Sequence, residues 1–170
     1  MTAFDNSFLK LHGIEGNYST DRSDPGNWTK GQVGEGIFKG TKYGISAKSY
    51  PDLDIINLTL DDAKVIAKRD YWDACHGDYL PPEFADALFD MAFNQGVVTA
   101  VKLFQKALGV TSDGVMGPVT LAAFITCNRK MVAKNFTTLR IIRYSMSLGW
   151  VTDAKGWVGR ALDAYVEMVI

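Results

Sequence analysis

Apolar residues recur at helical spacing from the start of the chain. The first four lie at positions i, i+4, i+7 and i+10: Phe4, Phe8, Leu11 and Ile14. This spacing places them on one face of a helix, and Asp5 or Asn6 is expected to cap its first turn. We therefore predict a first helix that ends near Glu15 and Gly16.

The helical pattern stops over residues 16–44. This stretch contains seven glycines and one proline: Gly16, Gly26, Gly31, Gly34, Gly36, Gly40, Gly44 and Pro25. Glycine and proline interrupt helices and favour turns and short hairpins. We predict a β-hairpin lobe over residues 16–45. A loop region this long is uncommon in a compact protein unless it serves a function.

Helical spacing returns after this lobe. Thr59 is expected to cap one helix, and Pro81-Pro82 to open a second. Gly109 is expected to end a third, and Gly117-Pro118 to begin a fourth. Apolar stripes predict two more helices, over 132–144 and 161–169. The predicted fold class is mainly α, an α+β arrangement in which the small N-terminal hairpin lobe forms one wall of a cleft.

The composition is that of an ordinary soluble globular protein. Of the 170 residues, 47% are hydrophobic and 22% are charged, and the formal net charge is −1. Such a small charge gives no field that would attract nucleic acid. No phosphate loop or other cofactor motif occurs, so no cofactor is expected.

Cysteine and histidine give no sign of a metal site or a disulfide framework. Cys75 and Cys127 are too few for a framework and are expected to behave as small buried hydrophobes. His12 and His76 lack the spacing of metal ligands, so no metal is expected. The first residues lack the basic start and apolar stretch of a signal peptide, and no apolar run is long enough to span a membrane.

Glu15 is the first candidate for catalysis. It stands at the predicted end of a helix, directly before the glycine-rich lobe, where a cleft between two lobes would form. Ile14 and Tyr18 beside it would raise the pKa of its carboxyl by desolvation, so that the protonated form could donate to a leaving oxygen. The competing interpretation is an ordinary surface glutamate at a helix end, and placement alone favours it.

Glycoside hydrolysis usually requires a second group, and the predicted hairpin lobe offers several. Its acids and hydroxyls include Asp21, Asp24, Glu35, Thr29 and Thr41. Asp24 lies nine residues after Glu15. Asp24-Pro25-Gly26 is also a strong turn signal, in which the carboxylate bonds nearby backbone N–H groups. The functional and the turn interpretations of Asp24 are equally favoured at this point.

Six groups of short strings occur in a fixed order along nearly the whole chain. They are Glu15-Gly16-Asn17-Tyr18, Asp24-Pro25-Gly26 with Thr41-Lys42-Tyr43-Gly44-Ile45, Tyr71-Trp72-Asp73, Phe89-Asp90-x-x-x-Asn94-x-Gly96, the segment 103–121, and Gly156-Trp157-x-x-Arg160. This order resembles glycoside hydrolase family 108, muramidases often found as bacteriophage endolysins. The sequence departs from the family pattern at Asn17, where a second glycine is usual, and in an insertion over residues 28–40.

The resemblance implies a lysozyme-like fold and cleavage of the β-1,4 bond between N-acetylmuramic acid and N-acetylglucosamine in peptidoglycan. It implies that Glu15 protonates the glycosidic oxygen. Asp24 and Thr41 would position an attacking water or stabilise the oxocarbenium-like transition state. A held water favours inversion of configuration, whereas carboxyls only about 5 Å apart favour a retaining route.

Aromatic and amide side chains are the candidates for substrate binding. Tyr18, Tyr43 and Trp28 have flat faces that could stack on sugar rings, although core packing or bracing of the hairpin is an alternative. Asn94 and Gln95 could hydrogen-bond N-acetyl groups, and a helix C-cap is an adequate alternative for Asn94.

The resemblance also covers the second half of the chain. Residues 103–124 are similar to segments that bind peptidoglycan, and Trp150, Trp157 and Arg160 are expected to brace the last helices. We predict one domain over 1–170, in which a catalytic motif region (1–95) packs against the helical peptidoglycan-binding-like segment (96–170), because no linker separates them.

The resemblance further suggests where the protein acts. We expect a monomer made in the host cytoplasm that reaches the cell wall in the periplasm after holin-type permeabilisation of the membrane. Two alternatives remain open: a protein that binds peptidoglycan without cutting it, and a lytic transglycosylase or chitinase.

Overall fold

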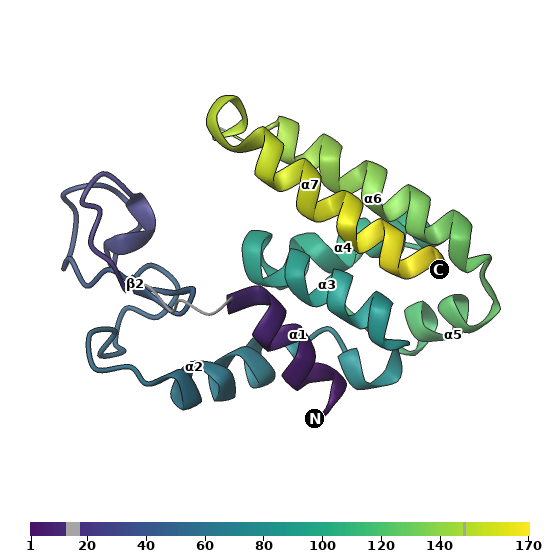
Figure 1. Cartoon of the computed structure of the whole chain (residues 1–170), viewed down its shortest axis with the longest axis horizontal. Helices are drawn as coiled ribbons and strands as arrows, with labels where there is room; N and C mark the ends of the chain where they lie inside the picture. The colour runs from purple at the N-terminus through teal and green to yellow at the C-terminus, as the bar shows by residue number, and fades with distance from the viewer. Residues whose placement is uncertain (13–17, 148) are drawn as a thin grey trace. The chain divides into compact units, whose positions relative to one another are not determined.

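The computed structural model describes residues 1–12, 18–147 and 149–170. Its elements in chain order are α1 (Ala3–His12), β1 (Tyr18–Ser19), η1 (Pro25–Asn27), β2 (Thr41–Lys42), β3 (Ile45–Ser46), α2 (Leu60–Ala67), η2 (Lys68–Trp72), η3 (Gly77–Tyr79), α3 (Pro82–Gln95), α4 (Val97–Leu108), α5 (Pro118–Thr126), α6 (Arg129–Ser145) and α7 (Trp150–Val169) (Figure 1). The described chain is mainly helical with a small antiparallel sheet. This confirms the predicted fold class.

The chain divides into two compact units. The hairpin unit comprises Phe8–Lys68, and the helical unit comprises Met1–Ser7 with Arg69–Ile170. The prediction of one domain over 1–170, with a cleft beside the hairpin lobe, stays a prediction.

The hairpin unit contains the three-stranded sheet. β1 pairs with β2, and β2 with β3, both antiparallel. Ser19 lies opposite Thr41, and Lys42 lies opposite Ile45, so the two-residue turn Tyr43-Gly44 connects β2 to β3. The strands are only two residues long, and much of the predicted β lobe is therefore irregular loop.

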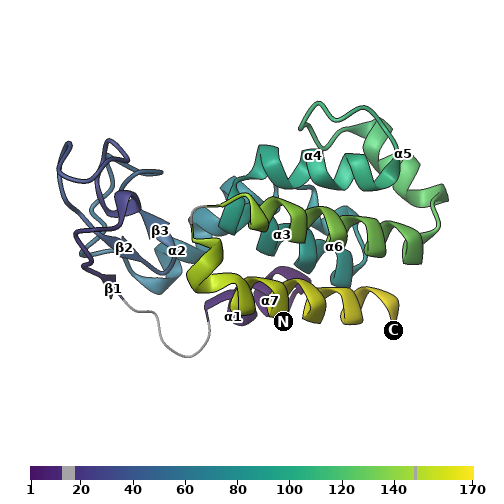
Figure 2. The ribbon, with the colours of Figure 1, turned by 90° about the horizontal axis from the view of Figure 1, so that it is seen from above.

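Four helices of the helical unit pack in a ring. α3 contacts α4 and α7, and α6 contacts the same two helices; Figure 2 shows α6 and α7 side by side. The core of this unit is rich in phenylalanine and includes Phe84, Phe89, Phe104 and Phe136. Burial of such large aromatic side chains is the main source of stability in a core of this kind. No helix in the described ranges is long and apolar enough to cross a membrane.

Local cap chemistry sets most helix ends where the sequence predicts them. Thr59 accepts a hydrogen bond from the backbone N–H of Asp62, whose carboxylate accepts one from Thr59 in return, so the two form a capping box. Pro82 begins α3, and Pro118 begins α5. Gly109 ends α4 with a φ of +75°, a conformation that glycine adopts without strain.

Two helix starts differ from the sequence prediction. Thr2 and Asp5 hydrogen-bond each other's backbone N–H groups, so Thr2 caps α1 and Asp5 lies inside its first turn. The prediction that Asp5 or Asn6 caps this helix is therefore wrong. α7 begins at Trp150, well before the apolar stripe over 161–169. Gly156 and Gly159 interrupt the apolar pattern but stay within the helix, because a glycine in a helix interior costs only about 1 kcal/mol.

Candidate active site

The predicted general acid, Glu15, lies outside the described residues. The other predicted site residues fall into two groups: Asp24, Thr41, Tyr18 and Tyr43 in the hairpin unit, and Asn94 and Gln95 in the helical unit.

Asp24 begins the short helical turn η1. Its Oδ1 accepts a hydrogen bond of 2.8 Å from the backbone N–H of Gly26, and its carbonyl accepts one of 3.1 Å from Asn27. The predicted turn role of Asp24 is therefore confirmed. The side chain is exposed, and one carboxylate oxygen is used by the turn. Among the described residues this bond engages Oδ1 alone, so Oδ2 can bind water.

Asn27, the last residue of η1, connects Asp24 to Thr41. Its side chain is fully buried, and its Oδ1 accepts a hydrogen bond of 2.6 Å from the Thr41 hydroxyl. Its Nδ2 donates to the Ser19 hydroxyl at 3.1 Å and to the Asp21 carbonyl at 2.8 Å. One amide thus joins the turn, β1 and β2, and it brings two of the predicted catalytic residues into one hydrogen-bonded network.

The network determines which way the Thr41 hydroxyl points. The Asp21 carbonyl can only accept, so the group 2.8 Å from it must be the amide nitrogen of Asn27. Oδ1 of Asn27 therefore faces Thr41, and the threonine must donate its single proton to it. The remaining Thr41 lone pairs can then accept a hydrogen bond, for example from a water molecule.

No sequence motif marked Asn27. A lone asparagine after Asp-Pro-Gly is indistinguishable from the many asparagines that occupy turns. Its burial depends on the return of the chain to Thr41, 14 residues later.

Tyr18 stabilises the residues that directly precede β2. Its hydroxyl donates a hydrogen bond of 2.9 Å to the carbonyl of Lys39. Gly40 lies against its ring, and a Cβ at Gly40 would come within 2.5 Å of the ring carbon Cε2. Tyr18 thus braces the hairpin, which was the predicted alternative to sugar stacking.

Tyr43 occupies an unusual backbone conformation at the tip of the β2–β3 hairpin. Its φ is +50° and that of Gly44 is +74°, the two positive values that a type I′ turn requires. A positive φ is costly for an aromatic residue and is enriched at functional sites. The Lys42 ammonium lies 5.5 Å from the centre of the ring, which is half-buried.

The insertion over 28–40 forms a closed loop. Trp28 and Phe38 pair at its neck, with ring centres 5.3 Å apart in an edge-to-face contact at 64°. The Arg22 guanidinium lies 4.5 Å from the Phe38 ring centre, and the Arg22 carbonyl accepts a hydrogen bond from the Trp28 indole. Trp28 therefore braces the loop. Bracing was the predicted alternative to stacking on a sugar.

Asp21, another candidate acid of the lobe, is committed to a turn. Its Oδ1 accepts hydrogen bonds from the hydroxyl and the backbone N–H of Ser23, and these bonds lower the pKa of Asp21. A carboxylate held in the charged form is a poor proton donor. Asp21 is therefore unsuited to the role of general acid.

Asn94 and Gln95 end α3 in the helical unit. The Asn94 amide donates to the carbonyl of Asp90 at 2.8 Å and to its Oδ1 at 3.3 Å, so it closes the last turn of the helix. The cap itself is Gly96. Gln95 is half-buried.

Asp90, on α3, pairs with residues of α6 and α7. It forms ion pairs with the fully buried Arg140 of α6 and with Arg160 of α7. Trp157 packs against Tyr144, with ring centres 5.6 Å apart and the ring planes tilted by 42°. These contacts confirm that Trp157 and Arg160 brace the last helices.

Gln105 organises the segment 103–124. The two N–H protons of its buried amide are shared among three acceptors, the Asp113 carboxylate, the Val115 carbonyl and the Thr120 hydroxyl, and its Oε1 accepts from the Gly114 N–H. The polar residues of this motif thus satisfy one another inside the fold. Gln105 appeared in the sequence motif, but its spacing gave no sign of this role.

The described residues contain no group of three or more histidine, cysteine or acidic side chains that could hold a metal. Cys75 is buried, and burial raises the pKa of its thiol to about 12. Cys127 is only partly buried. The expectation of a buried cysteine therefore holds for Cys75 but not for Cys127.

Comparisons with known proteins find a matching family and a similar fold. The sequence model of the family described as Glycosyl hydrolase 108 matches residues 8–96, and that of a peptidoglycan-binding domain matches residues 78–124. A solved structure titled "Structure of Brucella abortus SagA" is similar with a TM-score of 0.80 and 26% sequence identity, over 98% of this chain and 93% of that one. No curated protein matches.

Proposed function

Because the chain belongs to glycosyl hydrolase family 108, we propose that it is a muramidase that cleaves the β-1,4 bond between N-acetylmuramic acid and N-acetylglucosamine. The match of residues 78–124 to a peptidoglycan-binding domain supports peptidoglycan as the substrate. The observation that carries the mechanism is the fixed Thr41 hydroxyl, whose proton is held by buried Asn27.

Glu15 is the proposed general acid. Its proton passes to the glycosidic oxygen as the bond from that oxygen to the anomeric carbon breaks. The support for this role is the position of Glu15 in the Glu-Gly-x-Tyr string, within the residues matched by the family.

Thr41 and Asp24 are the proposed partners of Glu15. A water molecule donates one hydrogen bond to the lone pairs of Thr41 and its other proton to Oδ2 of Asp24. Its oxygen then attacks the anomeric carbon from the face opposite the leaving group, so the reaction inverts the configuration. The support is local: Asn27 occupies the Thr41 proton, and the turn uses only Oδ1 of Asp24.

The proposed binding residues are Tyr18, Tyr43, Asn94 and Gln95. Tyr43 has the best support, because its ring is only half-buried and its backbone is strained, a condition enriched at functional sites. For Tyr18 and Asn94, the contacts within the protein assign a bracing role first.

The proposed biological role is that of an endolysin. The enzyme would be made in the host cytoplasm and reach the wall in the periplasm after a holin-type permeabilisation, which ends in cell lysis. Expression with and without a pore-forming partner tests this role. Lysis is expected only with the partner, and lysis without it would contradict the proposal.

Glu15→Gln tests the chemical proposal. The amide has nearly the same shape but cannot donate an acidic proton, so turnover of purified peptidoglycan should fall by at least about 10²-fold. Binding to insoluble peptidoglycan in a pull-down should persist, and circular dichroism should be unchanged. A variant with wild-type turnover would exclude Glu15 as the acid.

Product analysis separates hydrolysis from the competing reaction. Mass spectrometry of the digest should show reducing muramic acid ends, whereas anhydro ends would indicate a lytic transglycosylase. NMR of a fresh digest should show the α-anomer first if the enzyme inverts the β-linkage. The β-anomer would favour a retaining route instead.

A further inference from the structure

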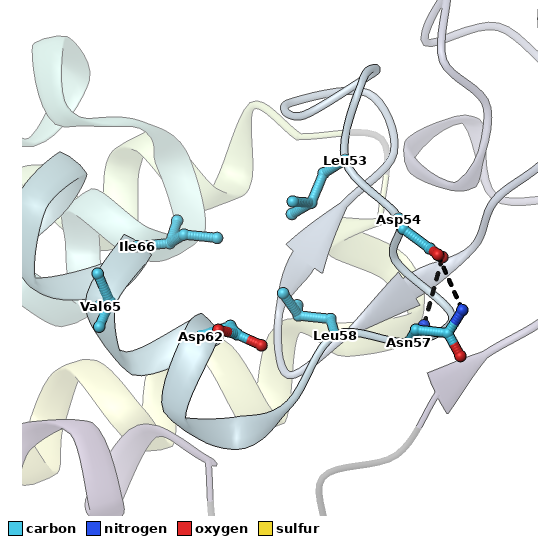
Figure 3. Close-up of a pocket in the computed structure, with 7 residues that line it drawn as sticks. All are labelled: Leu53, Asp54, Asn57, Leu58, Asp62, Val65 and Ile66. Atoms are coloured by element: carbon cyan, nitrogen blue, oxygen red, sulfur yellow. Dashed lines mark hydrogen bonds between the residues drawn. The ribbon is translucent and has the colours of Figure 1, made fainter.

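The hairpin unit has a groove beside the start of α2. The residues that line it come from the loop before α2 and from α2 itself: Leu53, Asp54, Asn57, Leu58, Asp62, Val65 and Ile66 (Figure 3). Its volume is about 440 Å³. This is large enough for a side chain or a small ligand.

Two lysines hold the loop that forms one wall of the groove. The Lys39 ammonium donates to the carbonyls of Pro51 and Leu53, at 2.6 and 3.1 Å. The Lys42 ammonium, on β2, donates to the carbonyl of Ile56 at 2.8 Å. These bonds fix the wall from the hairpin side, so the groove exists before any ligand binds.

The floor of the groove is apolar. The side chains of Leu53, Leu58 and Ile66 point toward its centre (Figure 3), and Leu58 and Ile66 are only 3% and 8% exposed. Val65 is 64% exposed and offers further apolar surface at the edge. Such a floor favours a chain of methylene groups, because it removes their apolar surface from water.

The rim of the groove is acidic. Asp54 accepts hydrogen bonds from the amide and the backbone N–H of Asn57, and Asp62 accepts them from the hydroxyl and the backbone N–H of Thr59. Both carboxylates are therefore pre-oriented. None of the described residues that line the groove is basic. Lys39 lies close enough to Asp54 to help lower the pKa of that carboxyl, whereas no cation is among the causes that lower the pKa of Asp62. Asp62 is therefore the carboxylate of the rim that attracts a cation.

The lining also argues against a sugar as the occupant. Sugar rings present many hydroxyl groups and stack on aromatic faces, whereas the floor consists of leucine and isoleucine, with no aromatic residue among the described lining. An aliphatic chain with a terminal ammonium matches both the floor and the rim.

We infer that this groove binds the aliphatic amine side chain of a peptidoglycan stem peptide. The inference rests on the proposed function, because the glycan strands that this enzyme cleaves carry peptides with a diamino acid. The methylene groups lie on Leu58 and Ile66, and the ammonium reaches the carboxylate of Asp62. The groove thereby makes the enzyme favour peptide-bearing strands over bare glycan.

A titration with a stem tetrapeptide, L-Ala-γ-D-Glu-L-Lys-D-Ala, tests the inference without any turnover. The same peptide with an acetylated lysine amine is the matched ligand. The NMR chemical shifts of residues 53–66 should change on binding. Acetylation should weaken binding about two- to fivefold, the range for an exposed ion pair. Equal binding of the two peptides would overturn the inference.

Two pairs of variants locate the site. Asp62→Asn keeps an oxygen for the Thr59 cap but removes the charge, and should weaken peptide binding about two- to fivefold. Asp61→Asn removes the same charge from the neighbouring residue outside the lining and should bind normally.

Val65→Lys adds a cation at the edge and should weaken binding, whereas Val33→Lys, also exposed but outside the groove, should not. Equal effects within either pair would contradict the site.

A kinetic measurement connects the groove to the substrate. The KM for peptide-bearing glycan should be lower than that for glycan stripped by an amidase, and Asp62→Asn should remove this difference with kcat unchanged. The same KM for both substrates would overturn the inference. A failure of the proposed function would differ, because neither glycan would then be hydrolysed while peptide binding remained.

Discussion

The Thr41 hydroxyl donates a hydrogen bond of 2.6 Å to Oδ1 of the fully buried Asn27. Through this bond, the strand that carries Thr41 is held to the turn that begins with Asp24. The two proposed partners of Glu15 thus depend on one side chain that takes no part in the chemistry itself.

Asn27→Ala should destabilise the hairpin unit. It removes three side-chain hydrogen bonds and leaves the Thr41 hydroxyl and the Asp21 carbonyl without this partner, so the free energy of unfolding should fall by about 3 kcal/mol. Urea denaturation measures the change. Asn6→Ala, at an exposed asparagine in α1, is the control and should change stability by less than about 0.5 kcal/mol. Similar losses in both variants would show that Asn27 is not a structural node.

Asp24→Asn separates the two roles of Asp24. The amide oxygen can still accept from the Gly26 N–H, so the melting temperature should stay near that of the wild type. The charge that takes the water proton is gone, so kcat should fall by about 10²- to 10⁴-fold. Asp24→Ala should lose both stability and activity. Full activity in Asp24→Asn would limit Asp24 to the turn.

Tyr43→Asn should raise the free energy of unfolding and weaken substrate binding. Asparagine tolerates the φ of +50° better than tyrosine, so the free energy of unfolding should rise by about 1 kcal/mol. If the ring stacks on substrate, KM should rise as the ring is removed. Thermal unfolding and steady-state kinetics measure the two effects. An unchanged KM would leave Tyr43 without a binding role.

The sequence predicts features that depend on neighbouring residues. The cap at Thr59, the proline starts of α3 and α5 and the glycine end of α4 each depend on residues within one turn of the helix. Their physical causes lie inside the short windows that the pattern covers. The same holds for the turn at Asp24.

The side-chain hydrogen bonds and ion pairs between distant residues could not be predicted in this way. Asn27 meets Thr41 across 14 residues, Gln105 meets Thr120 across 15, and Arg140 meets Asp90 across 50. Each partner is an ordinary polar residue on its own, and only the packed chain brings the two together. Family motifs marked Asp90, Gln105 and Thr41, but they did not say what these residues contact.

Asp90→Ala should lower the free energy of unfolding far more than the loss of Arg160, the exposed partner of Asp90. Arg140 is fully buried and would lose its counter-ion, which should lower the free energy of unfolding by about 3 to 5 kcal/mol. Arg160→Met should cost less than about 1 kcal/mol, because Arg160 is 47% exposed. Denaturation of Asp90→Ala, Arg140→Met and the double variant gives the coupling energy. An additive double variant would contradict the pairing.

The buried thiol of Cys75 should make stability fall at alkaline pH. Burial raises its pKa to about 12 from the ordinary value of 9.0, so the folded state holds a proton that the unfolded state releases. The thiol's contribution is fully present below pH 9 and is lost as the pH rises from about 9 to 12, by up to about 1.4 kcal/mol per pH unit. Urea denaturation between pH 8 and 10.5 measures this loss. Lysines and tyrosines also titrate there, so Cys75→Ala is the control and should show a shallower decline. Parallel curves for the two proteins would mean that the thiol ionises equally well in the folded state.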